Sequence, residues 1–292
     1  MIRAGFVERH LKIIFPLPAV LFIVVMMVFP VIYTIMLSFS NWNLTTGGAF
    51  AWAGLRSYVR IFKEPRFLDA SKRTFMFTGA AVVIETVLGT ALALILNRAF
   101  RGKGLVKLLL LLPLVATPVA VGIVWNLFYD PNIGLANFVL TRFGFQKLEW
   151  VYAANTVLPS LVLVDIWQWT PMITLLALAG LASLSTEPYE SAQVDGASKT
   201  QTLFYITLPM LMPTILTAMI LRSIDALKTF DIIYAMSGGG PGYASETLNI
   251  MAFKYSFEYF KMGQASVILV ALFLIVLGFS AGILKLRTWA EQ

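Results

Sequence analysis

Cysteine is absent from this 292-residue sequence, and histidine occurs once, as His10. Without cysteine the chain can form no disulfide and offers no thiolate to a metal or a substrate. A single histidine also excludes the HExxH pattern and any histidine cluster, so the sequence predicts neither a metal site nor a cofactor. The phosphate-binding pattern GxxxxGK[ST] is missing as well. The chain therefore cannot be its own P-loop ATPase, and we do not expect it to be an enzyme.

Charged residues are scarce too. They make up 13% of the chain, against about 25% in a soluble domain, while hydrophobic residues reach 59%. The mean hydropathy is +0.80, which is typical of a polytopic membrane protein. The net charge is +7, but no basic stretch is dense enough to follow a phosphate backbone, so no nucleic-acid partner is expected.

Six apolar runs are long enough to cross a bilayer as helices, which takes about 20 residues. The runs cover residues 12–39, 74–99, 105–128, 156–183, 206–236 and 263–286. They predict an all-α membrane protein with six transmembrane helices. No separate soluble domain is visible, so residues 1–292 are expected to form a single transmembrane domain.

The first run has a second interpretation, as a signal peptide. We reject it because the run is far longer than the 7–15 residues of a signal-peptide apolar region, and no A-x-A cleavage pattern follows. Within this run Pro16, Pro18 and Pro30 predict kinks, with the freed carbonyls satisfied by neighbouring helices.

The side of the membrane is suggested by local charge density. With both termini in the cytoplasm, the connections carry ten Lys and Arg inside and ten outside, so the total count is neutral. The short turn between the second and third runs, however, holds Arg98, Arg101, Lys103 and Lys107. This crowding favours a cytoplasmic turn and hence cytoplasmic termini. The outer count is raised by residues 55–73, where GLRSYVRIF predicts an amphipathic helix at the interface.

A polar connection between two runs, residues 184–205, has the pattern of two short helices. Glu187 and Glu190 fall in a first turn, where carboxylates are favoured, and Thr186 or Glu187 could cap that turn. Gly196 permits a sharp bend, and a second short polar helix should follow it. Pro209 then suits the start of the next membrane helix, where its missing N–H costs little.

Residues 190–209, ESAQVDGASKTQTLFYITLP, resemble the EAA loop of membrane subunits in bacterial ATP-binding-cassette importers. Ser191 departs from the family's usual alanine, a small residue in place of another. The resemblance implies a cytoplasmic coupling helix that docks into a groove on the ATPase. The residues that it assigns to coupling are Glu190, Ser191, Ala192, Asp195, Gly196, Ile206, Leu208 and Pro209. An ordinary cytoplasmic linker remains the alternative.

The resemblance extends over residues 11–288. The segments 230–234 (FDIIY) and 236–241 (MSGGGP), followed by Thr247, are similar to a signature of the carbohydrate-uptake class, which includes the maltose and glycerol-phosphate permeases. This implies the type I importer permease fold in the bacterial cytoplasmic (inner) membrane. It also implies several partners: a second, unlike permease, two ATP-binding subunits, and a periplasmic or lipid-anchored solute-binding protein that delivers a sugar-type substrate.

Ionisable residues within the apolar runs are costly and usually face protein or water. Arg222, Asp225, Lys228 and Asp231 alternate in sign at every third position, so neighbours could pair along a helix. Each step of three residues shifts the side chain by about 60° around the helix axis, so the four residues cannot form one polar stripe along a single pore. A ribbon of charges that winds across a subunit interface is plausible, and a self-neutralising ladder that only fixes helix packing is the alternative. For Glu85 a hydrogen bond to a neighbouring helix is the favoured interpretation.

Sugars are held by aromatic faces and hydrogen-bonding side chains. Trp125 and Trp169 could supply such faces, but an interfacial belt or packing explains them better. The candidates for the substrate path are Asp231, Phe230, Tyr234, Trp167, Asp165, Arg222, Asp225 and Lys228.

The leading interpretation is a permease subunit that forms half of the path for a sugar or sugar derivative and works by alternating access. The first rival is an ion-gradient-driven secondary transporter of a small polar solute. That class typically has inverted repeats and broken helices, and the sequence shows neither. The second rival, an intramembrane enzyme, would need a catalytic dyad or metal motif within the runs, and none is present.

Overall fold

The computed structural model describes residues 15–46 and 50–290, except for the side chains of residue 284 and residues 286–290. His10 and the start of the first predicted span, residues 12–14, lie outside the described residues. Within the described ranges every regular element is a helix, and the only β-type pairing is an isolated bridge between Ser40 and Trp52. The predicted all-α class is confirmed.

The six predicted spans are found among the described residues, provided that one strongly bent helix pair counts as a single span. The spans are α2–η1–α3 (Leu17–Ile23, Val24–Val28, Phe29–Ser38), α5 (Pro65–Leu96), α6 with α7 (Lys103–Val115, Pro118–Phe128), α9 (Val157–Ala182), α11–η3–α12 (Lys199–Thr202, Leu203–Thr207, Leu208–Leu227) and α15 (Met262–Ala290). The shorter helices are α4 (Arg56–Phe62), α8 (Leu135–Arg142), α10 (Glu187–Val194), α13 (Asp231–Ser237) and α14 (Leu248–Phe253), with a 3-10 turn η2 (Leu44–Thr46).

The described residues form two compact units. The N-terminal unit contains the residues up to Phe67 together with Ala252–Ala271, and the central unit contains Leu68–Met251 together with the residues from Leu272 onward. In the N-terminal unit, α4 buries Ile61, which confirms the short amphipathic helix predicted there. The Arg66 guanidinium in this unit lies over the rings of Tyr255 and Tyr259.

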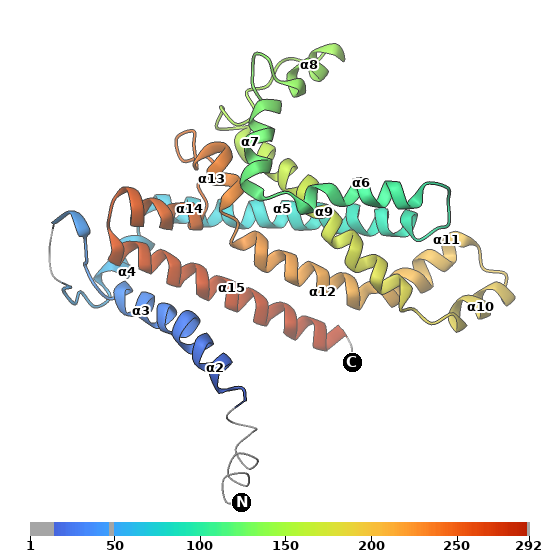
Figure 1. Cartoon of the computed structure of the whole chain (residues 1–292), viewed down its shortest axis with the longest axis horizontal. Coiled ribbons are helices and arrows are strands. Elements are labelled where there is room, and N and C mark those ends of the chain that lie inside the picture. The colour runs from blue at the N-terminus through green and yellow to red at the C-terminus, as the bar shows by residue number, and fades with distance from the viewer. Residues whose placement is uncertain (1–14, 47–49, 291–292) are drawn as a thin grey trace, which may run out of the picture. The chain divides into compact units, whose positions relative to one another are not determined.

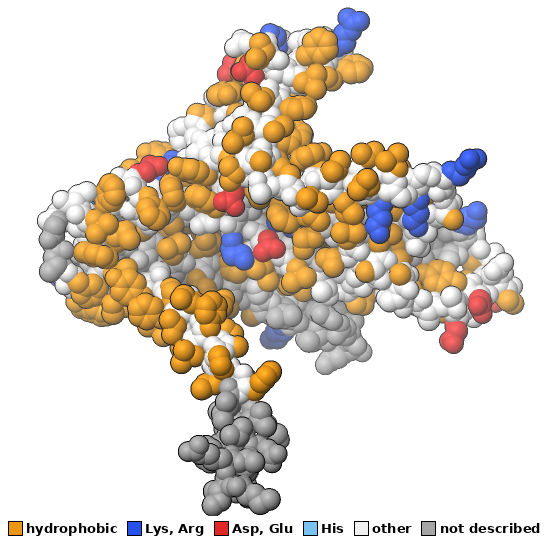
Figure 2. All heavy atoms as spheres, viewed as in Figure 1, with side chains coloured by type: hydrophobic (Ala, Val, Ile, Leu, Met, Phe, Trp, Pro, Cys, Tyr) orange, Lys and Arg blue, Asp and Glu red, His pale blue; other side chains and the backbone are white. Residues whose placement is uncertain are grey.

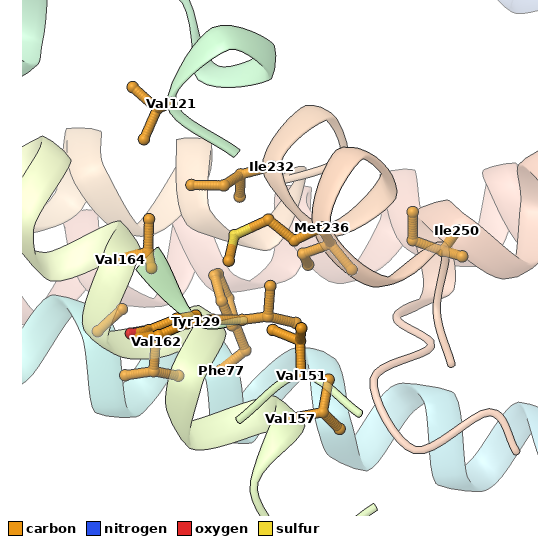
Figure 3. Packing of buried hydrophobic residues seen from close by; sticks show 13 residues of the cluster. Phe77, Val121, Tyr129, Val151, Val157, Val162, Val164, Ile232, Met236 and Ile250 are labelled. Atoms are coloured by element: carbon orange, nitrogen blue, oxygen red, sulfur yellow. The ribbon is translucent and has the colours of Figure 1, made fainter. Parts of the chain in front are cut away.

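The central unit has a main core where α5, α7, α9 and α13 meet (Figures 1 and 3). Phe77, Val121, Val162, Ile232 and Met236 point toward one another there, and each is buried. A second cluster, formed by Ala93, Ala177, Leu181, Leu211 and Ile215, holds α5, α9 and α12 together.

Gly180 allows α9 and α12 to approach closely in this second cluster. A Cβ at Gly180 would lie 2.7 Å from Cγ2 of Thr214 and 2.8 Å from Cδ1 of Leu211. A larger residue at this position would therefore require the side chains of Thr214 and Leu211 to shift. This contact matters for the site because α9 and α12 both lead into the polar connection at residues 184–205.

The third span, predicted as one apolar run over 105–128, is broken into two helices. The axes of α6 and α7 differ by 101°, and the break falls at Ala116 and Thr117, both of which have extended backbone. Pro118 explains the position, since it disfavours helical backbone in the residue before it and has no N–H of its own. The freed carbonyl of Ala116 accepts a hydrogen bond from Nε2 of Gln168 at 3.2 Å.

The fifth span is shorter than predicted at its C-terminal end. The predicted run 206–236 is interrupted, because α12 ends at Leu227 and α13 begins at Asp231 as a separate helix. Nδ2 of Asn249 donates to the carbonyl of Lys228 at 2.7 Å, which satisfies one group at the helix end. The loop predicted after α13 is confirmed, with left-handed backbone at Gly238, Gly239 and Gly242.

The start of the fifth span also differs from the prediction, which placed a helix beginning at Pro209. The helix is continuous from Lys199 to Leu227. A π-helical turn, η3, precedes the proline, and the N–H of Leu208 bonds the carbonyl of Leu203 five residues back. This wider turn accommodates Pro209, which has no N–H to donate. The same arrangement occurs at η1, two residues before Pro30.

Candidate coupling loop and polar cavity

The connection at residues 184–205 forms two short helices, α10 and α11, at one end of the central unit (Figure 1). Gly196, just after α10, has φ +74°, in the left-handed region. Its N–H bonds the carbonyl of Gln193 at 3.2 Å, and the N–H of Ala197 bonds the carbonyl of Ala192 at 2.9 Å. This pair of bonds is a Schellman motif, which ends a helix and satisfies its last carbonyls. The bend predicted at Gly196 is confirmed.

The second short helix, also predicted, is fixed at its start by a capping box. Oγ of Ser198 accepts from the N–H of Gln201 at 3.3 Å, and Oε1 of Gln201 accepts from the N–H of Ser198 at 2.8 Å. At the start of α10, by contrast, Thr186 occupies the cap position without a side-chain hydrogen bond. Ala197, whose N–H completes the Schellman motif, comes directly before Ser198, the first residue of the capping box. The turn between the two helices is therefore closely defined by local bonds.

The residues expected to couple to an ATPase divide into two groups. Glu190, Ser191, Asp195 and Gly196 are exposed on α10 and the turn after it, whereas Ala192 is buried. A second group lies where the helix from α11 becomes the membrane span, with Ile206 and Leu208 half-buried and Pro209 exposed. Val194, an apolar side chain that is 88% exposed at the tip of α10, was not predicted from the sequence.

The basic turn at residues 98–107 lies at the same end of the central unit as α10. Arg98 and Asn97, at the end of α5, line a cavity of about 950 Å³ together with Tyr189, Gln193 and Gly196 of the connection. In Figure 2, positive and negative side chains gather at this end, whereas hydrophobic side chains predominate over α6 and α7. The basic turn and the connection at residues 184–205, which were each predicted to be cytoplasmic on separate grounds, therefore lie together.

A buried ion triad joins three spans in the middle of the central unit. Arg222 of α12 donates from Nε to Oε2 of Glu85 at 2.8 Å and from Nη2 to Oε1 of Glu85 at 3.2 Å. Its Nη2 also pairs with Oδ2 of Asp165 on α9. All three side chains are at most 1% exposed. The hydrogen bond from Glu85 to a neighbouring helix is thus confirmed, and Arg222 bonds across helices and not along its own.

Of the series considered along one helix, only Asp225 and Lys228 pair with each other. Since α12 ends at Leu227, Asp231 belongs to α13 and does not continue the series. Nζ of Lys228 lies 3.5 Å from Oδ1 of Asp225, and both side chains are about half exposed. Lys228 therefore pairs with Asp225, whereas Asp231 is exposed in the first turn of α13, where a carboxylate is favoured.

A cavity of about 440 Å³ lies beside the triad. Its lining residues are Pro118, Asp165, Gln168, Trp169, Arg222, Asp225, Lys228, Thr229, Phe230, Asp231 and Ile232. Six of the eight candidates for the substrate path are among them. Trp167 and Tyr234 are not: the Trp167 ring packs edge-on against Trp125 at 5.5 Å, and Tyr234 stacks on Phe230 at 5.2 Å.

Two residues of the cavity were missed as path candidates. Gln168 was not considered, although a glutamine in an apolar run is itself a signal of a buried polar role. Trp169 was assigned to a belt or to packing, but its ring lies 5.1 Å from the Arg222 guanidinium carbon. Among the described residues, Oε1 of Gln168 and Oδ1 of Asp165 are buried without a hydrogen-bond donor. The cavity wall thus carries two acceptors, two cations and aromatic faces.

Comparison with known proteins places this arrangement in one family. The profile of the family described as "Binding-protein-dependent transport system inner membrane component" matches residues 85–287. The chain is 35% identical over 278 residues to the trehalose/maltose transport system permease protein MalF of Thermococcus litoralis, covering 95% of this chain and 94% of the relative. It is 34% identical over 266 residues to the trehalose transport system permease protein SugA of Mycobacterium tuberculosis, covering 91% and 85%.

A third relative, the sulfoquinovosyl glycerol transport system permease protein SmoG of Agrobacterium fabrum, is 32% identical over 279 residues, covering 96% of this chain and 91% of the relative. Among solved structures, a chain of a bacterial importer of the acidic polysaccharide alginate superposes with a TM-score of 0.87 at 20% identity, with full coverage of both chains. At this identity the structural match shows the fold alone, which is that of an importer permease.

Proposed function

Because this chain belongs to the family of binding-protein-dependent transport system inner membrane components, we propose that it is one of two unlike permease subunits of a sugar importer. It is a multi-pass permease of an ATP-binding-cassette importer. Membership of that family excludes the secondary transporter kept open by the sequence. The broken third span, α6 with α7, is therefore not evidence for a secondary transporter.

The observation that carries the proposal is one continuous helix between the coupling loop and the polar cavity. Lys199–Leu227 is 29 residues long and spans about 43 Å. Its first turn follows the bend at Gly196, and near its far end lies Arg222, which lines the cavity and holds Glu85 and Asp165. A displacement of α10 by a docked ATPase would therefore be carried to the cavity as a rigid-body movement. This is the link that alternating access requires.

The cavity suits a sugar. Phe230 and Trp169 offer aromatic faces. Oδ1 of Asp165 and Oε1 of Gln168, which lack a donor, could accept hydrogen bonds from sugar hydroxyl groups. The lining contains three acidic and two basic side chains, which favours an uncharged sugar over an acidic one. Relatives that transport trehalose or maltose support this class.

The assembly follows from the coupling loop. One chain offers one docking loop, at residues 184–205, so two ATP-binding subunits require a second permease, and the resemblance to the maltose and glycerol-phosphate permeases favours an unlike one. A periplasmic or lipid-anchored binding protein would deliver the sugar to the side opposite α10. In this proposal residues 1–292 form a single permease domain, ATP hydrolysis is left to the partners, and both termini face the cytoplasm with α10.

Reconstitution tests the proposal directly. Vesicles that contain this chain, its second permease and the ATPase should take up radiolabelled trehalose or maltose only when the binding protein and ATP are both present. Omission of the second permease should abolish uptake, because one docking loop is then lost. Uptake by this chain as a homodimer would contradict the unlike pair, and uptake driven by an ion gradient without ATP would contradict the function.

Neutralising one carboxylate tests the cavity. Asp231→Asn keeps the size of the side chain, and we expect uptake to fall roughly tenfold or more, the cost of a lost hydrogen bond to a charged group, while the complex still assembles. Since Lys228 pairs with Asp225, the double variant Asp231→Asn/Lys228→Met should not restore uptake. The exposed Glu149→Gln is a matched control that should transport normally. Restored uptake in the double variant would show that Asp231 only balances Lys228.

A further inference from the structure

A second hollow of the central unit lies between α5 and α9 and shares no residue with the polar cavity. Its volume is about 690 Å³. Most of its wall is apolar, formed by Met76, Ala80 and Ile84 of α5 and by Leu158, Leu163 and Ile166 of α9. Met76, Ile84 and Leu163 are more than 40% exposed. This groove therefore opens on the outside of the two membrane spans.

One end of the groove is charged. Asp69, Lys72 and Arg73 of α5 line it there, together with Asn155. Nη2 of Arg73 lies 3.8 Å from Oδ2 of Asp69, whereas Nη1 of Arg73 is buried without an acceptor. An unsatisfied buried guanidinium N–H is unfavourable, and a phosphate oxygen is an acceptor that guanidinium groups favour. Lys72 and Arg73 together thus leave this end with one positive charge in excess of the Asp69 carboxylate, which suits an anion.

The length and position of the groove match one leaflet of a bilayer. Eleven residues separate Arg73 from Ile84, which is about 16 Å along a helix, and half of a hydrocarbon core is about 15 Å. Lys72 and Arg73 come directly before the apolar run that begins at residue 74, so they fall at the level of lipid headgroups. The other end of α5, at Leu94, lines the cavity beside the coupling loop. The groove therefore belongs to the leaflet opposite α10.

We propose that this groove binds one anionic phospholipid, with an acyl chain along α5 and α9 and the phosphate at Lys72 and Arg73. A helix of another protein with an apolar face would cover the wall but would bring no anion to Lys72 and Arg73. A free phosphate would satisfy the cations but leave the apolar wall exposed. The inference needs only the position of the chain in a membrane and is independent of the sugar.

Native mass spectrometry of the chain, purified in mild detergent with its associated subunits, tests the site. Dioleoylphosphatidylglycerol should be retained in preference to dioleoylphosphatidylcholine. Each basic residue near a headgroup strengthens the binding of an anionic lipid about fivefold. Lys72→Gln/Arg73→Gln should therefore lower the affinity for dioleoylphosphatidylglycerol about thirtyfold. The matched control Arg142→Gln/Lys147→Gln removes equal charge from exposed positions at the end of α8 and in the loop after it, and should leave binding unchanged.

Two further measurements keep the test independent of folding. Ala80→Phe fills the groove without altering charge and should also reduce retention of the lipid. A photoactivatable amino acid in place of Met76 should cross-link to phospholipid. Equal retention of the two lipids, unchanged binding in Lys72→Gln/Arg73→Gln, or cross-linking mainly to the second permease would each overturn the proposal.

Discussion

Replacing Gly196 with valine should abolish ATP-driven uptake while the protein still inserts into the membrane in normal amount. Gly196 has φ +74° and closes the Schellman motif that ends α10. Left-handed backbone costs an ordinary L-residue about 1–2 kcal/mol, and a β-branched residue more. No atom lies within 4 Å of a Cβ built there, so the effect comes from the backbone and not from a clash. The valine should unwind the turn and change the direction of α10 relative to the helix Lys199–Leu227 that follows it.

Two substitutions separate the effect of conformation from that of position. Gly196→Asn should keep most of the uptake, because asparagine tolerates left-handed backbone. Gly144→Val introduces the same strain at φ +82° in the loop after α8, also with no atom within 4 Å, and should transport normally. Uptake through vesicles and substrate-stimulated ATP hydrolysis are the measurements.

Glu190→Lys tests the charge of the coupling loop in the same assay. It places a cation in the first turn of α10, where the helix dipole favours an anion, on the surface that we expect to dock into the ATPase. Uptake should again be lost without loss of insertion. Normal uptake and normal ATPase stimulation in both Gly196→Val and Glu190→Lys would remove the coupling role from this loop.

Removing the cation of the buried triad should have the largest effect on stability. Arg222→Met leaves Glu85 and Asp165 buried without their partner. Loss of one member of a buried ion pair costs about 3–5 kcal/mol, so we expect an early unfolding transition and little assembled complex. Thermal unfolding in detergent and size-exclusion chromatography are the measurements.

The triple variant Glu85→Gln/Asp165→Asn/Arg222→Met provides the comparison. Since it buries no charge, it should regain most of the lost stability. The exposed pair gives the control: Lys228→Met should change stability by less than about 1 kcal/mol, as is usual for solvent-exposed ion pairs. A stable Arg222→Met, or a triple variant no better than the single one, would mean that the triad does not hold the three spans together.

Several features of this protein could be predicted from the sequence because they depend on residues close together in the chain. A helix crosses a bilayer when about 20 consecutive residues are apolar, so composition alone located the spans. The coupling loop was equally local, since a glycine bend followed by a Ser198–Gln201 capping box needs only neighbouring residues. The break in the third span is a local effect too, because Pro118 disfavours helical backbone in the residue before it.

The polar site was decided by the tertiary structure. Arg222 lies 57 residues from Asp165 and 137 from Glu85, so its pairing depends on how α12 packs against α9 and α5. Spacing by three suggested partners along one helix, but that pattern holds only while the helix continues, and α12 ends at Leu227. The sequence by itself determined which residues enter the membrane and where the loop bends. Which buried charges meet was fixed by close helix contacts, because an ionised group in an apolar interior must find whichever opposite charge the packing brings to it.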